Sequence, residues 1–264
     1  MIPKALEQVE LWRSKWTESG HLLVALDFDG TIAPIVKRPQ DGYMLGSARL
    51  AIESLLKRPD GDVAIVSGRA LDDLRERSAI SGVYYSGNHG LQIDGPGVHE
   101  TRPDALQLVP RMREIGLQLE RALTNIAGVF LEDKQLTLSV HSRMVDDETE
   151  RQRIHAIVEA TVAAAGNGLR LTYGKRVVEV RPDIEWHKGD ALLLLIDRIA
   201  KARDSALFTL YVGDDRTDED AFAALRGQGV GVLVAEALPA ETAAGAWAAS
   251  PEEVVAVLEA LAGS

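Results

Sequence analysis

Two carboxylates stand two positions apart in the segment Asp27-Phe28-Asp29-Gly30-Thr31. Residues i and i+2 of an extended backbone point to the same side, so both carboxylates can reach one small ligand. One carboxylate can attack phosphorus and form an aspartyl-phosphate. The other can protonate the leaving oxygen and then activate water. We therefore predict that Asp27 is a nucleophile and Asp29 its acid–base partner, the alternative being a simple Asp-Gly turn.

A second acidic group, Asp214 and Asp215 with Asp218 close behind, follows a predicted strand. Clustered carboxylates repel one another unless a cation lies between them. Mg²⁺ prefers carboxylate and water oxygens and bridges to phosphate. We predict a magnesium site formed by Asp27, by Asp214 and by the backbone carbonyl of Asp29, with Asp215 in support. Asp218 could belong to this site or could complement the dipole of the helix it begins.

Ser67 and Lys188 could hold a phosphoryl group. The Ser67 hydroxyl and the N–H groups after it are suitable donors, and a lysine can neutralise developing negative charge. Each residue also has an ordinary explanation: Ser67 as the N-cap of the next helix, and Lys188 as an exposed surface side chain. Their positions at the ends of predicted elements favour the catalytic interpretation.

The elements that position these residues alternate between short apolar runs and helical patterns. Predicted strands cover 22–26, 63–66, 83–85, 207–212 and 230–234. Predicted helices cover 47–57 with Ser47 as N-cap, 71–80, 189–201, 218–225 and 251–261 with Ser250 as N-cap. This pattern predicts an α/β fold with a Rossmann-like parallel-sheet core and helices on both faces. Ligands bind beyond the carboxyl ends of such strands, where Asn88-His89 also falls.

The middle of the chain has a different pattern. Helical stripes cover 105–126 and 146–165, and strands with alternating polar and apolar residues lie around 136–140 and 178–180. We predict a smaller α+β cap domain at 108–184, inserted into a core formed by 1–107 and 185–264. Its helices would cover the apolar face of its sheet and leave a polar face for a ligand or for solvent.

Composition excludes several classes of protein. The 264 residues include 29 basic and 40 acidic side chains, a net charge of −11, which argues against binding a nucleic-acid backbone. The absence of cysteine excludes disulfides and thiol chemistry. No apolar run has the length of a membrane span, and the first residues lack a signal-peptide pattern. We expect a cytoplasmic protein without a membrane partner; the sequence leaves the oligomeric state open, a monomer included.

Four of these features resemble, in order, the motifs of the haloacid dehalogenase-like phosphatases. They are Asp27-x-Asp29-Gly-Thr, Ser67, Lys188 and Gly213-Asp214-Asp215. The resemblance spans nearly the whole chain, and the combination is far more specific than any one part. It implies a phosphatase that uses Mg²⁺.

A closer resemblance is to the trehalose-6-phosphate phosphatase family, and it rests on segments 26–31, 66–69, 87–90, 188–189 and 213–220, with 131–134, 139–143, 174–175 and 179–182 in the insert. It implies a phosphorylated disaccharide as substrate. In the core it implies contacts from Gly68, Arg69, Asn88 and His89. In the cap it implies contacts from Glu132, Lys134, Arg143, Lys175 and Glu179. One departure is Trp186-His187, where an asparagine is expected beside Lys188.

The pattern of the cap agrees in part with this resemblance. Lys175 and Glu179 share one face of their strand, opposite Val178 and Val180. Thr137, Ser139, His141 and Arg143 likewise share one parity. Glu132 and Lys134 have the opposite parity to Arg143 unless the chain turns at Asp133. The alternative for this polar face is an ordinary solvated sheet surface.

Three alternatives to hydrolysis of trehalose 6-phosphate remain at this stage. One is a related sugar phosphatase, acting on a sucrose or mannosylglycerate phosphate. A second is a phosphomutase, which returns the phosphoryl group to a sugar. A third is a receiver-like or degenerate binding domain, but such a domain needs neither the second acid at Asp29 nor a cap insert.

Overall fold

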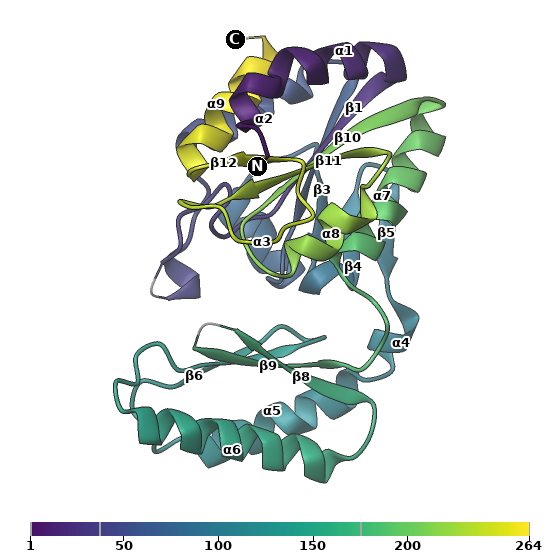
Figure 1. The fold of residues 1–264 in the computed structure, drawn as a ribbon. Helices are drawn as coiled ribbons and strands as arrows, with labels where there is room; N and C mark the ends of the chain where they lie inside the picture. Colours follow the sequence, from purple (N-terminus) through teal and green to yellow (C-terminus); the bar gives the residue numbers. More distant parts are fainter. Residues whose placement is uncertain (1, 37, 175, 264) are drawn as a thin grey trace. The chain divides into compact units, whose positions relative to one another are not determined.

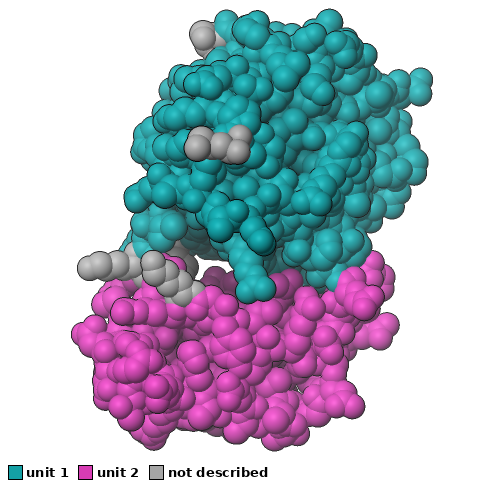
Figure 2. Space-filling view, in the orientation of Figure 1, with its two compact units in different colours: residues 1–36, 40–100, 186–264 teal, residues 37–39, 101–185 magenta. Residues whose placement is uncertain are grey.

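The computed structural model describes residues 2–36, 38–174 and 176–263. They form two compact units, coloured separately in Figure 2. Unit 1 takes the described residues of Met1–Val36, Gln40–Glu100 and Trp186–Ser264, and unit 2 consists mainly of Thr101–Glu185. The insert therefore also contains the short helix α4 (Pro103–Leu106), which precedes the predicted start at residue 108.

Unit 1 is built on one sheet, whose strands among the described residues run in the order β12 (Ala246–Ala248), β11 (Gly229–Val234), β10 (Ala206–Gly213), β1 (Gly20–Leu26), β2 (Gly61–Val66), β3 (Tyr84–Gly87), β4 (Gln92–Gly95) and β5 (Val98–Thr101). Pairing is parallel from β12 to β3 and antiparallel between β3 and β4. β1 lies at the centre of the sheet, and the chain builds outward from it in both directions (Figure 1). Such a switch point is where open α/β sheets bind ligands.

The central strand shows why helices cover both faces of this sheet. Leu22, Val24 and Leu26 belong to one buried cluster, while Leu23 and Ala25 belong to the other. The first cluster also contains side chains of α1 (Val9–Ser19), α2 (Gly46–Leu56), α3 (Leu71–Ser78) and α9 (Pro251–Ala262). The second contains side chains of α7 (Lys188–Arg203) and α8 (Asp218–Ala224). The predicted Rossmann-like core is confirmed.

Helix starts were predicted with mixed success. The Ser250 hydroxyl accepts the Glu253 N–H at 3.4 Å, as predicted for an N-cap. The Ser47 prediction was wrong, because α2 begins at Gly46 and its N-cap is Leu45. Leu45 fits there because its backbone N–H bonds to the carbonyl of Ile32 (2.9 Å), and this tertiary contact fixes where the helix begins.

Unit 2 is a four-stranded sheet among the described residues, in the order β6 (Phe130–Asp133), β7 (Leu138–His141), β9 (Val177–Pro182) and β8 (Leu169–Gly174), all antiparallel. Helices α5 (Val109–Leu123) and α6 (Glu148–Ala165) pack against its apolar face through one buried cluster. The single helix predicted over 105–126 is divided into α4 and α5, with Pro110 in the first turn of α5.

Strands β4, β5 and β12 were not predicted, nor were β6 and β8 at the two edges of the unit 2 sheet. β4 and β5 each contain a single large apolar residue, Ile93 and Val98, and lie at one edge of the sheet, whereas β12 has three residues at the other edge. Short or polar edge strands lack the apolar run that marks a buried parallel strand. Three 3₁₀ segments complete the elements of the part of the chain that the structure describes: η1 (Ala5–Gln8), η2 (Pro39–Asp41) and η3 (Asn88–Gly90). Within the described residues, every helix is too short or too polar to cross a membrane.

Candidate active site

The predicted catalytic residues of unit 1 meet at the carboxyl edge of its sheet. Leu26, the last residue of β1, pairs with Ile65 of β2 and with Val212 of β10. Asp27 continues this pairing, since its N–H bonds to the Val212 carbonyl at 2.8 Å. The parallel register therefore brings the residues that follow β1, β2 and β10 to one level.

Lys188 lies at the first position of α7 and is buried with Asp27. Its Nζ donates to Oδ1 of Asp27 and to Oδ1 of Asp218, both at 2.7 Å. Burial alone lowers the pKa of Lys188, but the two facing carboxylates outweigh this effect and raise it well above its usual value. The ammonium therefore stays charged beside the predicted nucleophile, and the interpretation as an exposed lysine was wrong.

Asp218 holds this arrangement together. Its side chain is fully buried, and Oδ1 accepts a second hydrogen bond from the Tyr211 hydroxyl at 2.7 Å. Oδ2 accepts the N–H groups of Asp214 and Asp215, both at 3.0 Å. These bonds occupy both oxygens of Asp218. Its role is therefore to orient Lys188 and the turn after β10.

Tyr211 was missed in the sequence. Its hydroxyl reaches Asp218 from inside β10, where an aromatic residue fits the buried sheet as well as an aliphatic one. The signal was present: a tyrosine three residues before Asp214 carries a polar group that a buried strand must satisfy.

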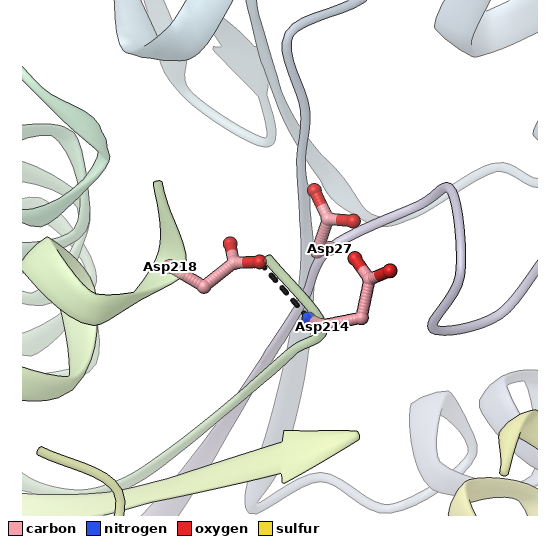
Figure 3. A group of neighbouring side chains, drawn as sticks. All are labelled: Asp27, Asp214 and Asp218. Atoms are coloured by element: carbon pink, nitrogen blue, oxygen red, sulfur yellow. Dashed lines mark hydrogen bonds between the residues drawn. The ribbon is translucent and has the colours of Figure 1, made fainter. Parts of the chain in front are cut away.

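Asp27, Asp214 and Asp218 form a cluster that fits a metal ion. One ligand oxygen from each lies within 4.8 Å of the others, and Figure 3 shows the three side chains gathered after β1, after β10 and at the start of α8. Burial, with like charge from Asp218, raises the pKa of Asp214 to about 7. Burial also raises the pKa of Asp27, against the opposing charge of Lys188. A divalent cation would relieve this excess of negative charge.

Asp215 differs from its neighbours in the cluster. Its carboxylate accepts the N–H and the hydroxyl of Thr217, both at 2.7 Å. Although burial raises the pKa of Asp215, Lys188 and these hydrogen bonds outweigh it and leave the pKa below its usual value. Asp215 therefore adds a negative charge beside the cluster, and its supporting part in a metal site stays a prediction.

Gly30 is required by the close approach of the acidic cluster. Its φ is +83°, and a Cβ at this position would lie 2.0 Å from Oδ2 of Asp214. Any other residue would be strained and would displace that carboxylate. Gly30 thus leaves room for the carboxylate of Asp214.

Asp29 is held by Arg69 in this structure. Two guanidinium nitrogens of Arg69 donate to the two carboxylate oxygens of Asp29, at 2.7 and 2.6 Å. Arg69 also donates to Asp73 at 2.8 Å, and its guanidinium lies over the ring of Phe28. The carboxylate of Asp29 is outside the acidic cluster of Asp27, Asp214 and Asp218, and the metal contact through its backbone carbonyl stays a prediction.

Ser67 is not the N-cap of α3, since that helix begins at Leu71 after Ala70. Its hydroxyl instead accepts the N–H of Arg69 at 3.2 Å, and its carbonyl accepts the N–H of His89 at 2.9 Å. A Cβ on Gly68 would lie 2.5 Å from the His89 ring, so these two residues are packed closely. The predicted group Ser67, Gly68, Arg69 and His89 is therefore contiguous.

Asn88 and His89 both adopt positive φ angles, 50° and 56°. This conformation is uncommon outside glycine and costs energy that the surrounding contacts must offset. The N–H of Asn88 bonds to the carbonyl of Arg69 at 2.7 Å, and its side chain, fully buried, donates to Gln92. The loop after β3 is thus tied to the loop after β2.

Two of the cap residues predicted from resemblance, Glu132 and Glu179, lie on one face of the unit 2 sheet. Cross-strand pairing places Glu132 opposite Ser139, and Ser139 opposite Glu179. The expected turn is present: β6 ends at Asp133, and Lys134 N–H bonds to the Thr137 carbonyl at 3.0 Å. Glu132 therefore shares the polar face despite its parity along the chain.

Lys134 and Glu179 form a buried ion pair at 3.0 Å. Arg143 lies just after β7, and its carbonyl accepts a hydrogen bond from Arg176 at 3.3 Å. Lys175, also predicted to contact the sugar, lies outside the described residues.

The unusual Trp186-His187 pair leaves Lys188 in place. His187 is the N-cap of α7: its Nδ1 accepts the N–H of Asp190, whose carboxylate accepts the N–H of His187 at 2.9 Å. Trp186 donates to the carbonyl of Gly90 at 2.9 Å. The histidine does the capping that an asparagine could do.

A carboxylate at the end of the central parallel strand, facing a buried lysine and a cluster of acids, places this fold in the haloacid dehalogenase-like class of phosphatases. The chain belongs to the trehalose-phosphatase family, whose sequence model matches residues 25–249.

Individual relatives agree with this assignment. Trehalose 6-phosphate phosphatase RA3 of Zea mays is 36% identical over 275 residues, which cover 98% of this chain and 74% of that protein. The trehalose-phosphate phosphatase of Mycobacterium avium is 38% identical over 81% of this chain and 54% of its own length. The C-terminal domain of Candida albicans trehalose-6-phosphate phosphatase has the same fold, with a TM-score of 0.77 at 23% identity over 100% of this chain and 98% of that one.

Proposed function

We propose that this chain hydrolyses trehalose 6-phosphate to trehalose and phosphate through an aspartyl-phosphate on Asp27. The observation that carries the proposal is the buried contact of Lys188 with Asp27 beside Asp214, in a chain of the trehalose-phosphatase family.

The first step transfers the phosphoryl group to Asp27. Its carboxylate attacks phosphorus in line, while the sugar oxygen leaves and takes a proton from Asp29. Lys188 is already charged and in contact with Asp27, so it can stabilise the phosphoryl oxygens without rearrangement. The Ser67 hydroxyl and the N–H groups that follow it supply further donors.

The second step returns the enzyme to its starting state. Asp29, now a carboxylate, takes a proton from water, and the resulting hydroxide attacks phosphorus and releases Asp27. In this structure Arg69 donates to both carboxylate oxygens of Asp29. The contact must loosen before Asp29 acts as an acid, since both of its oxygens are occupied.

Mg²⁺ fits the acidic cluster, with Asp27 and Asp214 as carboxylate ligands. A bound Mg²⁺ supplies charge stabilisation at the phosphate and orients it. Asp218 contributes indirectly, because its hydrogen bonds fix the backbone that carries Asp214.

The polar face of unit 2 is proposed to bind the disaccharide through Glu132, Lys134, Arg143, Lys175 and Glu179. Charged and planar hydrogen-bonding groups suit sugar hydroxyls.

The cytoplasmic location stays a prediction, and so does the monomer as one of the oligomeric states that the sequence allows.

Phosphate release from a panel of substrates tests the proposal. Trehalose 6-phosphate is compared with sucrose 6-phosphate and glucose 6-phosphate, with Mg²⁺ or with EDTA. We expect Mg²⁺-dependent release that is fastest for trehalose 6-phosphate. Equal rates for the three sugars would refute the substrate, and phosphate appearing on another sugar instead of in solution would indicate a mutase.

Variants separate the two units in this assay. Asp27→Asn is expected to abolish turnover on every substrate, whereas Asp72→Asn on the exposed side of α3 serves as the matched control. Arg143→Ala and Glu179→Ala are expected to reduce turnover of trehalose 6-phosphate far more than turnover of p-nitrophenyl phosphate. Equal losses on both substrates would argue against a sugar-binding cap.

A further inference from the structure

Two glutamates of unit 2 stand at the same level of its sheet, on either side of strand β7. Glu132 of β6 and Glu179 of β9 both pair with Ser139. Directly paired residues share a face, so both carboxylates lie on the polar face. Two strand spacings separate their Cα atoms, about 10 Å.

Glu179 is fixed by the β6–β7 hairpin. Its Oε1 accepts from Lys134 at 3.0 Å, from Ser139 at 3.3 Å and from Thr137 at 3.5 Å. These donors come from three positions of one tight hairpin. The rotamer of this side chain is therefore set by its own sheet.

Glu132 is fixed in a different way, by a histidine. Nε2 of His141 lies 2.8 Å from Oε2 of Glu132. The exposed fractions of the two side chains are only 14% and 18%. The His141 ring also stacks on Phe130, its cross-strand partner, with centroids 5.8 Å apart and planes at 29°.

In this contact the donor, the stacked ring of His141, is more rigid than the acceptor, the side chain of Glu132. A glutamate side chain loses rotamer freedom when it binds a ligand, and a hydrogen bond that has already fixed it reduces that cost. The stacked imidazole cannot follow Glu132 if the carboxylate turns away, so Glu132 loses the bond in other rotamers. The hydrogen bond exists whether His141 is neutral with Nε2–H or doubly protonated.

We infer that His141 is a positioning residue for substrate specificity: it holds Glu132 in the rotamer that binds the sugar hydroxyls. The inference rests on the proposed function of Glu132. His141 acts through Glu132 and takes no part in phosphoryl transfer.

Three variants test this role. His141→Phe keeps a ring against Phe130 but removes the donor. His141→Gln restores a donor of similar reach. His155→Phe is the matched control, because His155 also contacts an aromatic ring, that of Tyr173 on the helix side of unit 2, with centroids 5.9 Å apart.

Two readouts distinguish positioning from general damage. KM and kcat are measured for trehalose 6-phosphate and for p-nitrophenyl phosphate, which has no sugar. Binding of trehalose 6-phosphate is also measured by calorimetry in an Asp27→Asn background, where it is not turned over. We expect His141→Phe to raise KM and Kd for the sugar phosphate about tenfold, the effect of losing a hydrogen bond to a charged group. We expect His141→Gln to recover most of this, while p-nitrophenyl phosphate and the control change less than about twofold.

The outcomes separate the inference from the function on which it rests. Equal losses of His141→Phe on both substrates would show a structural role and overturn the inference. A Glu132→Gln variant that binds trehalose 6-phosphate normally would refute the proposed sugar site itself. If Glu132→Gln weakens binding and His141→Phe does not, the sugar site stands and the positioning role of His141 is wrong.

Discussion

Replacing Asp214 by asparagine is expected to stabilise the metal-free protein while removing its response to Mg²⁺. Asp214 lies in the acidic cluster, and burial with the charges of Asp218 and Asp215 raises its pKa from 3.8 to about 7. The folded protein therefore disfavours the ionised form of this side chain. Asparagine has nearly the same shape and carries no charge.

The shift in pKa sets the size of the effect. A difference of about three pH units corresponds to about 4 kcal/mol, and we expect about 2–4 kcal/mol because Asp214 is not fully buried. Because the pKa of Asp214 is raised on folding, ionisation of this side chain destabilises the folded wild type. This destabilisation is absent below about pH 4, grows as the pH rises and is constant above about pH 7. Below pH 7 the advantage of Asp214→Asn should thus shrink by about 1.4 kcal/mol per pH unit at most.

Urea unfolding followed by tryptophan fluorescence measures this difference. All four tryptophans belong to unit 1, the unit that contains Asp214, and they are Trp12, Trp16, Trp186 and Trp247. Curves are recorded at pH 6, 7 and 8 in EDTA and again with Mg²⁺. Mg²⁺ at about 100 times its dissociation constant should stabilise wild type by about 2.7 kcal/mol and the variant by much less.

A surface aspartate provides the control. Asp197 of α7 is about half exposed and pairs with Lys201 at 2.7 Å, so Asp197→Asn should change stability by less than about 0.5 kcal/mol under all conditions. If Asp214→Asn is no more stable than wild type in EDTA at pH 8, the acidic cluster is not under electrostatic strain. An unchanged Mg²⁺ response of the variant would show that Asp214 is not a ligand.

Three further variants follow from the structure. Asp218→Asn is expected to lose about 2–4 kcal/mol in urea unfolding and most activity, because its amide NH₂ would face two donors at either end: Lys188 and the Tyr211 hydroxyl at one, and two backbone N–H groups at the other; unchanged stability would contradict the hydrogen-bond assignment. Gly30→Ala is expected to abolish Mg²⁺ binding in titration calorimetry, because its Cβ would collide with Asp214, and normal binding would show that the loop can adapt. Ser250→Ala should cost about 1 kcal/mol of thermal stability with activity unchanged, as for other N-caps; a loss of activity would mean that α9 influences the site.

The strands that carry the catalytic residues could be predicted because burial on both faces leaves a clear sequence signal. Residues 22–26 are uniformly apolar and end at Asp27, and β1 ends there in the structure. The strands β4 and β5 have no such run, and they are held by pairing with neighbours that the local sequence does not reveal. Helix α2 shows the same limit, because its start depends on a contact with Ile32.

Within the site, the residues proposed to carry the chemistry could be predicted better than the residues that position them. These candidates are charged residues at the ends of predicted elements, and the sequence alone reveals them: Asp27, Asp29, Lys188 and Asp214. The contact of Arg69 with Asp29 crosses 40 positions of sequence, and the Tyr211 hydroxyl is hidden in an apolar strand. Such partners are determined by register and by side-chain direction, which a single sequence does not encode locally.

The pairing of β1 with β10 has a consequence for how this protein is made. Asp27 leaves the ribosome 161 positions before its partner Lys188. The strands and helices of unit 2 are contiguous within Thr101–Glu185, so their contacts close shorter loops. During synthesis the inserted unit can therefore complete its core first. The acidic cluster with Lys188 arises last, after β10 has emerged, so a nascent chain carries a folded unit 2 before it can perform any chemistry.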